Sequence, residues 1–164
     1  MTPPTKLLFV CLGNICRSPA AENIMDHLLK TTSPELEILC DSAGTGSYHV
    51  GSAPDRRMTQ AAQRQGIEMQ GRARQLMAAD LAEFDLILAM DRDNFRNIQA
   101  LDPSGRYASK IKMMCDYCAD HDDKEVPDPY YGGESGFQYV IELLTDACQG
   151  LLAELKTSSP QDSN

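Results

Sequence analysis

The sequence predicts an α/β fold: an open, mainly parallel four-stranded sheet with helices on both faces. Two observations lead to this prediction. Four short apolar segments alternate with helical patterns along the 164 residues, as strands joined by right-handed crossovers do. One of these segments, 84–91, is almost continuously apolar between acidic residues, which is typical of a parallel strand covered on both faces.

The expected strands are the segments 6–10, 36–43, 84–91 and 111–115. The first two lead directly into loops that contain glycine. In open α/β sheets, loops at the carboxyl ends of strands hold ligands, so we expect a binding site at this edge.

Helical periodicity fills the intervals between the strands. Helices are expected over residues 20–30, 54–65, 77–83 and 135–155. Asp91 should cap a further helix that begins near residue 93, and Arg56 and Arg57 are interpreted as a solvated helix start.

The length predicts one domain, residues 1–156. The remaining residues, 157–164, contain no hydrophobic side chain and should form a disordered tail.

Residues 11–18, CLGNICRS, follow the first strand and lead into a helix, with Ser18 as the expected N-cap and Pro19 at the first helical position. A loop of this length can turn successive backbone N–H groups inward as an anion-binding nest, which the helix dipole reinforces. Gly13 permits close backbone approach, and Asn14 tolerates left-handed backbone angles. The segment therefore predicts a site for an oxyanion.

Cys11 and Arg17, with five residues between them, indicate that this anion is phosphate-like. Arg17 can donate two parallel hydrogen bonds to phosphate oxygens. A helix N-terminus and an arginine also stabilise a thiolate, so Cys11 is a candidate nucleophile aimed at phosphorus. A buried strand-end thiol beside an unrelated surface arginine is the alternative, and the full strand–loop–helix arrangement disfavours it.

The stretch 10–19, VCLGNICRSP, resembles the CX5R phosphate-binding loop of the low-molecular-weight protein tyrosine phosphatases, and the resemblance extends over about residues 6–155. It implies the phosphotyrosine phosphatase I-like, Rossmann-like fold. It also implies hydrolysis of phosphotyrosine and aryl phosphates through a phosphocysteine intermediate. No metal and no cofactor are expected, because the loop and Arg17 supply the charge stabilisation. The expected phosphate-binding residues are Leu12, Gly13, Asn14, Ile15, Cys16, Arg17 and Ser18.

A second motif, VPDPYYGG at 126–133, resembles the acid loop of the same family. Two prolines stiffen the backbone around Asp128. Alone, the motif would be interpreted as a proline-rich surface turn. Beside the Cys11 loop, the resemblance implies that Asp128 is the general acid and base, with Cys11 as nucleophile and Arg17 stabilising the transferred phosphoryl group. Ser18 would donate a hydrogen bond to the leaving thiolate.

The resemblance also assigns supporting roles. The cleft wall should consist of Tyr48, His49, Tyr130 and Tyr131, and the last two are candidates for phosphorylation themselves. Loop support should come from Asn14, Ser18 and Ser42, with Ser42 hydrogen-bonded to the loop. Gly71 stands where many members carry a buried histidine, so one support of the loop is expected to be missing.

Composition limits the partners. The net charge of −9 argues against nucleic acid and anionic membranes as partners. No apolar run is long enough to span a bilayer, residues 1–5 lack the features of a secretion signal, and the six cysteines show no secreted framework. We expect a cytoplasmic monomer that acts on phosphotyrosyl proteins or small aryl phosphates.

Two cysteine patterns leave alternatives open. Cys16 either forms a reversible, protective disulfide with Cys11 or is a small buried thiol. Cys115, Cys118 and His121 could ligate zinc, but a structural site needs four ligands. Strand-end and loop thiols are therefore favoured.

Two other functions fit part of the sequence. An arsenate reductase of the same fold would need resolving cysteines after the third strand, where this chain has Met90 and Asp91. A non-catalytic phosphate-binding module would need neither a thiol at Cys11 nor an acid at Asp128. The sequence therefore favours the phosphatase.

Overall fold

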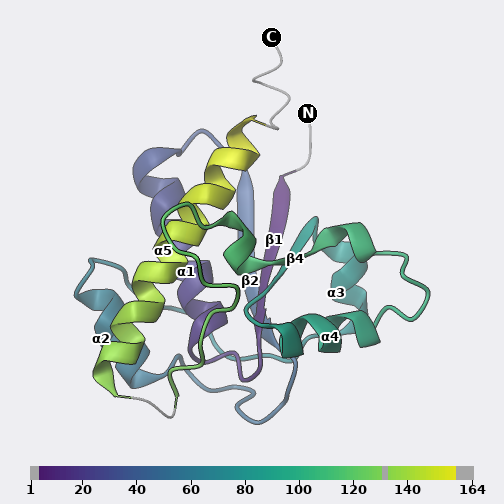
Figure 1. Ribbon diagram of the computed structural model, residues 1–164, viewed down its shortest axis with the longest axis horizontal. Coiled ribbons are helices and arrows are strands. Elements are labelled where there is room, and N and C mark those ends of the chain that lie inside the picture. The colour runs from purple at the N-terminus through teal and green to yellow at the C-terminus, as the bar shows by residue number, and fades with distance from the viewer. Residues whose placement is uncertain (1–3, 131–132, 158–164) are drawn as a thin grey trace.

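The computed structural model describes residues 4–130 and 133–157, and these form the coloured ribbon of Figure 1. Within them, four strands form one parallel sheet in the order β2-β1-β3-β4, and helices cover both of its faces. The predicted fold class is confirmed. The strands are β1 (Thr5–Cys11), β2 (Ile38–Gly44), β3 (Leu86–Ala89) and β4 (Ile111–Met113).

The helices separate into two layers (Figure 1). One layer holds α1 (Arg17–Thr32), α2 (Arg56–Gln63) and α5 (Glu134–Thr157), and the other holds α3 (Ala78–Glu83) and α4 (Arg92–Ala100). Two short 3₁₀ helices, η1 (Ala108–Lys110) and η2 (Met114–Tyr117), flank β4. None of the helices in this part of the chain is both long enough and apolar enough to cross a membrane.

The central strand β1 serves both layers because successive side chains of a strand point to opposite faces. Leu7 and Phe9 belong to the core shared with α1, α2 and α5, whereas Leu8 and Val10 belong to the core shared with α3 and α4. All four side chains are completely buried. This two-sided burial explains why the strand is continuously apolar from Leu7 to Val10 and why its end, Cys11, lies inside the molecule.

Helix starts differ in part from the prediction. The helix α1 begins at Arg17 with Cys16 as N-cap, so the assignment of Ser18 as N-cap is wrong. The physical reason is that the Ser18 hydroxyl bonds to side chains of the preceding loop instead of to the helix. By contrast, Asp91 caps α4 as predicted, and its carboxylate accepts the N–H of Asn94 at 2.8 Å.

Other boundaries shift by a few residues. Asp55 caps α2, because its carboxylate accepts the N–H groups of Arg57 and Met58. The strand expected over 111–115 ends at Met113, and the chain turns into η2. Thr157, expected in the tail, is the last residue of α5, while residues 158–164 lie outside the described part.

The helix α5 crosses η2 at Gly150, and this crossing generates a stability prediction. A Cβ atom at position 150 would overlap the carbonyl oxygen of Tyr117, which is backbone and cannot rotate away. The variant Gly150→Ala should therefore lower the free energy of unfolding by about 1–3 kcal/mol, although alanine is the better helix former. Urea denaturation measures this difference.

Gly136 of the same helix provides the control, because a Cβ there would make only an ordinary contact with Pro129, at 3.8 Å. Gly136→Ala should be neutral or stabilising by up to about 1 kcal/mol. A Gly150→Ala protein as stable as wild type would contradict the tight crossing.

Candidate active site

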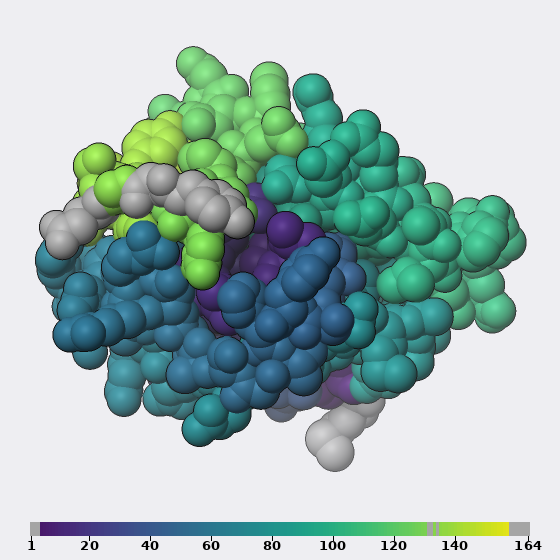
Figure 2. Space-filling model, turned by 90° about the horizontal axis from the view of Figure 1, so that it is seen from below, coloured from purple at the N-terminus to yellow at the C-terminus, as the bar shows by residue number. Residues whose placement is uncertain are grey.

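The loop after β1, the residues after β2 and β3, and the segment 126–130 meet at the carboxyl edge of the sheet. Figure 2 views the molecule from below and shows purple N-terminal residues at the bottom of a hollow, framed by blue and green segments. The hollow lies at the edge of the sheet where we expected a binding site.

Cys11 lies at the centre of this edge and is only 2% exposed. Its Sγ accepts the N–H of Asn14 at 3.2 Å and lies 3.0 Å from the hydroxyl oxygen of Ser18. Asn14 adopts the left-handed conformation that its residue type tolerates, with φ of 57°. The loop therefore curls back over the sulfur.

Backbone contacts around the loop support the anion-binding nest. Three loop carbonyls accept hydrogen bonds from surrounding segments: Cys11 from Thr45, Leu12 from Gly46, and Ile15 from Asp55. In a trans peptide the N–H that follows a carbonyl points the opposite way. The N–H groups of Leu12, Gly13 and Cys16 are thus turned toward the interior of the loop.

Arg17 is a buried cation, 3% exposed, with partners from two other segments of the chain. Its Nη1 donates to the Asp91 carboxylate at 2.7 Å and to the Val126 carbonyl at 3.1 Å, and its Nη2 lies 3.6 Å from Asp128. Burial by itself would lower the pKa of Arg17, but the charges of Cys11, Asp91 and Asp128 raise it above its usual value. The guanidinium is therefore a fixed positive charge beside the sulfur.

Asp91 has a second role that the sequence did not reveal. Besides capping α4 through Oδ1, it holds Arg17 through Oδ2. Its position directly after the third strand was a usable signal, because this strand end shares an edge with the end of β1.

Asp128 lies opposite the Cys11 loop, and its side chain is 39% exposed. Its Oδ1 accepts the N–H of Tyr130 at 3.0 Å. The start of its loop is attached to the end of β3, because the Val126 N–H donates to the Met90 carbonyl at 2.8 Å. The structure thus brings Asp128 close to Cys11 and Arg17, which precede it by more than 100 residues in the chain.

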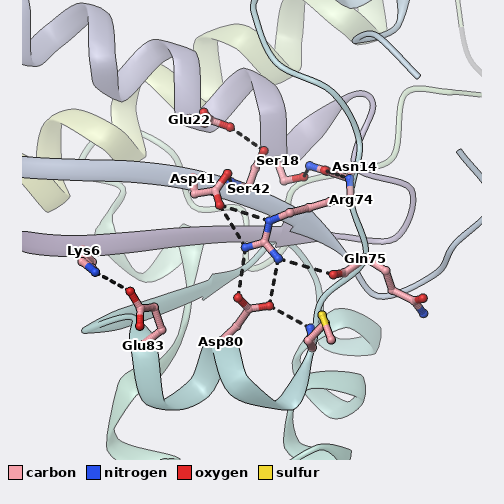
Figure 3. A network of polar contacts seen from close by, with 11 residues as sticks. Lys6, Asn14, Ser18, Glu22, Asp41, Ser42, Arg74, Gln75, Asp80 and Glu83 are labelled. Atoms are coloured by element: carbon pink, nitrogen blue, oxygen red, sulfur yellow. Dashed lines mark hydrogen bonds and ion pairs between the residues drawn. The ribbon is translucent and has the colours of Figure 1, made fainter. Parts of the chain in front are cut away.

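The loop supports differ from the expectation at one residue. Asn14 donates to the Ser18 hydroxyl at 2.8 Å and accepts the N–H of Arg74 at 2.9 Å. The hydroxyl of Ser42 instead donates to Glu22 at 2.6 Å (Figure 3). The expected direct bond from Ser42 to the loop is therefore corrected to a bond with α1.

Arg74 was not predicted as a site residue, because the segment around it has no regular secondary structure. Its guanidinium bridges Asp41 of β2 and Asp80 of α3, with contacts of 3.0 Å to each (Figure 3). Burial alone would lower the pKa of Arg74, but hydrogen bonding to Asp80 and the charge of Asp41 raise it. The side chain thereby anchors the backbone N–H that holds Asn14.

Gly71 adjoins a small cavity of about 50 Å³ behind the phosphate loop, which Asn14, Glu22 and Ser42 also line. The backbone at Gly71 has φ of 104°, where glycine is favoured. A Cβ there would meet nothing within 4 Å. We expected a side chain that supports the loop to be missing at position 71, and the structure has open space there.

The residues expected on the cleft wall do not all gather at one place. The His49 ring lies 6.2 Å from the Tyr130 ring and packs over Gly13, where a Cβ would come within 3.0 Å of it. Tyr48 is 78% exposed and lines, with Leu12, a hollow of about 320 Å³ that extends toward α4. Tyr131 lies outside the described residues.

The sequence also raised Cys16 as a disulfide partner of Cys11 and His121 as a zinc ligand. Burial, followed by the charges of Asp55 and Cys11, raises the pKa of the buried Cys16 thiol, so it stays protonated. The His121 ring is bonded to Asp146 at 2.7 Å. Over residues 4–130 and 133–157, no three His, Cys, Asp or Glu side chains are grouped to hold a metal.

The fold and the site define an α/β protein in which a thiol and a buried arginine share one curled loop at the carboxyl edge of the sheet. The family model described as "Low molecular weight phosphotyrosine protein phosphatase" matches residues 6–161, and the chain belongs to this family. A Synechocystis sp. relative with a provisional low molecular weight protein-tyrosine-phosphatase name is 63% identical over 92% of this chain and 96% of its own length.

Solved structures agree with this assignment. A protein tyrosine phosphatase from Entamoeba histolytica, with Hepes in its active site, has a TM-score of 0.88 and 44% identity, covering 94% of this chain and 98% of its own. YfkJ from Bacillus subtilis has a TM-score of 0.89 and 39% identity, covering 96% and 98%.

The end of β2 generates a prediction about phosphate binding. A Cβ at Gly44 would lie 2.7 Å from the Leu12 carbonyl oxygen and 3.2 Å from Asn14, both part of the phosphate loop. Gly44→Ala should therefore displace the loop and weaken binding of inorganic phosphate by about tenfold or more. Titration followed by NMR measures this affinity.

The control is Gly46→Ala, whose Cβ would meet only the ring of the exposed Tyr48, which can move away, and the side chain of Leu12. This variant should bind phosphate nearly as wild type does. Equal affinities for all three proteins would disprove the steric argument.

Glu22 generates a pH prediction. Burial, with the nearby Asp41 charge, raises the pKa of Glu22 to about 7. The folded state then holds this proton more tightly than the unfolded state. The free energy of unfolding therefore falls as pH rises from the pKa of Glu22 in the unfolded chain to about 7, its pKa in the folded protein. Relative to Glu22→Gln, wild type should lose about 2 kcal/mol of unfolding free energy between about pH 5 and about pH 8.

Urea denaturation at both pH values measures the difference, and Glu68→Gln, at an exposed carboxylate, is the control. If wild type and Glu22→Gln showed the same pH dependence, Glu22 would not be a buried, protonated acid.

Proposed function

We propose that this chain hydrolyses phosphotyrosine in proteins, and aryl phosphates, through a phosphocysteine at Cys11. The observation that carries the proposal is the convergence of a thiol, a buried guanidinium and a carboxyl group on one curled loop. Arg17 contacts the carboxyl group of Asp128 at 3.6 Å, and the Cys11 sulfur lies beneath the same loop. Membership of the family supports the assignment.

In the first step, the Cys11 thiolate attacks phosphorus in line with the leaving oxygen. The S–P bond forms, the P–O bond to the phenyl ring breaks, and Asp128 gives its proton to the departing oxygen. The loop N–H groups and Arg17 stabilise the equatorial oxygens. Because Arg17 Nη1 is already bonded to Asp91 and Val126, we assign the two hydrogen bonds to the phosphoryl oxygens to Nη2 and Nε.

In the second step, ionised Asp128 takes a proton from water as the water oxygen attacks phosphorus. The P–S bond breaks, inorganic phosphate is formed and the Cys11 thiolate is regenerated. Ser18 and the Asn14 N–H stabilise this thiolate, since they lie 3.0 Å and 3.2 Å from the sulfur.

The side chains beside the loop favour a substrate with an aromatic leaving group. His49 and Tyr130 stand beside the loop, and an aryl ring can pack between such side chains. Tyr48, on the far side of Leu12, would contact residues that flank the phosphotyrosine. We assign phosphotyrosyl proteins as the substrate class and a monomer as the active form.

A thiol nucleophile also requires a reducing compartment, and we therefore propose the cytoplasm as the site of action. All six cysteines are free thiols, which fits that proposal.

The alternatives receive less support. After β3, where an arsenate reductase would carry resolving cysteines, Met90 is fully buried and Asp91 is bonded to Arg17. A binding module would not require the carboxyl group of Asp128 beside the phosphate site.

The proposal predicts distinct effects for two variants. Cys11→Ser should abolish hydrolysis of para-nitrophenyl phosphate, because a serine hydroxyl, unlike a thiolate, does not attack phosphorus at a useful rate. Asp128→Ala should lower the rate of leaving-group departure by about 10²–10⁴-fold. Excess chelator should change neither wild type nor Asp128→Ala. Pre-steady-state release of nitrophenol measures these rates, and turnover that survives in Cys11→Ser would refute the phosphocysteine mechanism.

A further inference from the structure

The orientation of Asp128 depends on the backbone two residues later. The Tyr130 N–H donates to Asp128 Oδ1 at 3.0 Å. Pro129 lies between them and restricts the backbone there. Whatever holds Tyr130 in place therefore helps to aim the carboxyl group.

Arg57 of α2 holds Tyr130 from the outside. Its Nη2 donates to the Tyr130 carbonyl oxygen at 3.0 Å, and its guanidinium carbon lies 5.4 Å from the centre of the Tyr130 ring. The same guanidinium lies 4.6 Å from the ring of Phe137, which is 1% exposed in the core. Arg57 thus connects the acid loop to α5. It stands in the first turn of α2 and its side chain is 42% exposed, as expected for a solvated helix start, but its contacts with Tyr130 and Phe137 were not predicted.

The inner end of the same segment is attached to the phosphate loop. Asp55 receives the Arg57 N–H at 2.8 Å and lies 3.5 Å from its guanidinium, while the Asp55 N–H donates to the Ile15 carbonyl at 2.7 Å. Residues 55–57 therefore bond to the loop of the nucleophile at one end and to the loop of the acid at the other.

We propose that Arg57 is a positioning residue for the protonation step: through Tyr130 it holds Asp128 at the separation from Cys11 that proton transfer to the leaving oxygen requires. The inference rests on the proposed phosphatase activity and assigns Arg57 no contact with substrate. Proton transfer needs hydrogen-bond distance, so a displacement of about 1 Å is costly.

The test exploits the leaving group. Phenyl phosphate releases a phenolate that needs protonation, because its conjugate acid has a pKa of about 10, like tyrosine. Dinitrophenyl phosphate releases a far weaker base and needs little protonation. We would measure kcat/KM for both substrates, since this parameter reports the step in which Cys11 is phosphorylated and the leaving group departs.

Arg57→Ala should lower kcat/KM for phenyl phosphate by about 10- to 100-fold and for dinitrophenyl phosphate by less than about threefold. Retained activity on dinitrophenyl phosphate also shows that the variant is folded. Arg57→Lys, which keeps a charge and one donor but loses the planar fork, should recover part of the loss.

Arg56→Ala is the matched control, because Arg56 is the preceding residue, has the same charge and is exposed. This control should match wild type on both substrates. In an Asp128→Asn background, Arg57→Ala should cause no further loss on phenyl phosphate, since the group that it positions can no longer donate a proton.

Equal losses on both substrates, or a full additional loss in the Asp128→Asn background, would overturn the positioning role while leaving the phosphatase assignment intact. A wild-type protein inactive on both substrates would instead refute the proposed function, and this inference with it.

Discussion

The buried positive charge of Arg17 is the constraint on which the site depends. A guanidinium that is almost fully removed from water is stable only with close anionic or carbonyl partners. Arg17 finds them in Asp91, Val126 and Asp128, which follow β3 or belong to the acid loop. One charge at the start of α1 thereby gathers loops from three parts of the chain around the Cys11 sulfur.

Two further arginines hold the surrounding loops, which have no regular hydrogen-bond pattern of their own. Arg74 connects the backbone that supports Asn14 to β2 and α3, and Arg57 connects the acid loop to α2 and α5. In both cases, a planar group with several donors bridges a loop to elements packed in the core. Rigidity at the site therefore comes from the helical and strand framework through these side chains.

Hydroxyl groups near the loop show how tertiary context selects among partners. Ser18 was expected to cap its helix and Ser42 to bond the loop, yet Ser18 faces Cys11 and Asn14, and Ser42 faces Glu22. A serine hydroxyl can satisfy either a local backbone group or a distant side chain. Which partner the hydroxyl bonds depends on which polar groups the fold buries, because a buried group cannot hydrogen-bond to water.

The sequence by itself determined the parallel α/β sheet, the curled loop with Asn14 in a left-handed conformation, and the Asp91 cap, because periodicity, residue type and local spacing encode them. Family resemblance added Asp128. Only the tertiary structure decided that Asp91 also holds Arg17, that Ser42 contacts Glu22, and that Arg57 and Arg74 support loops. These contacts join residues that are 20 to 74 positions apart and depend on side-chain direction and burial, which no local pattern records.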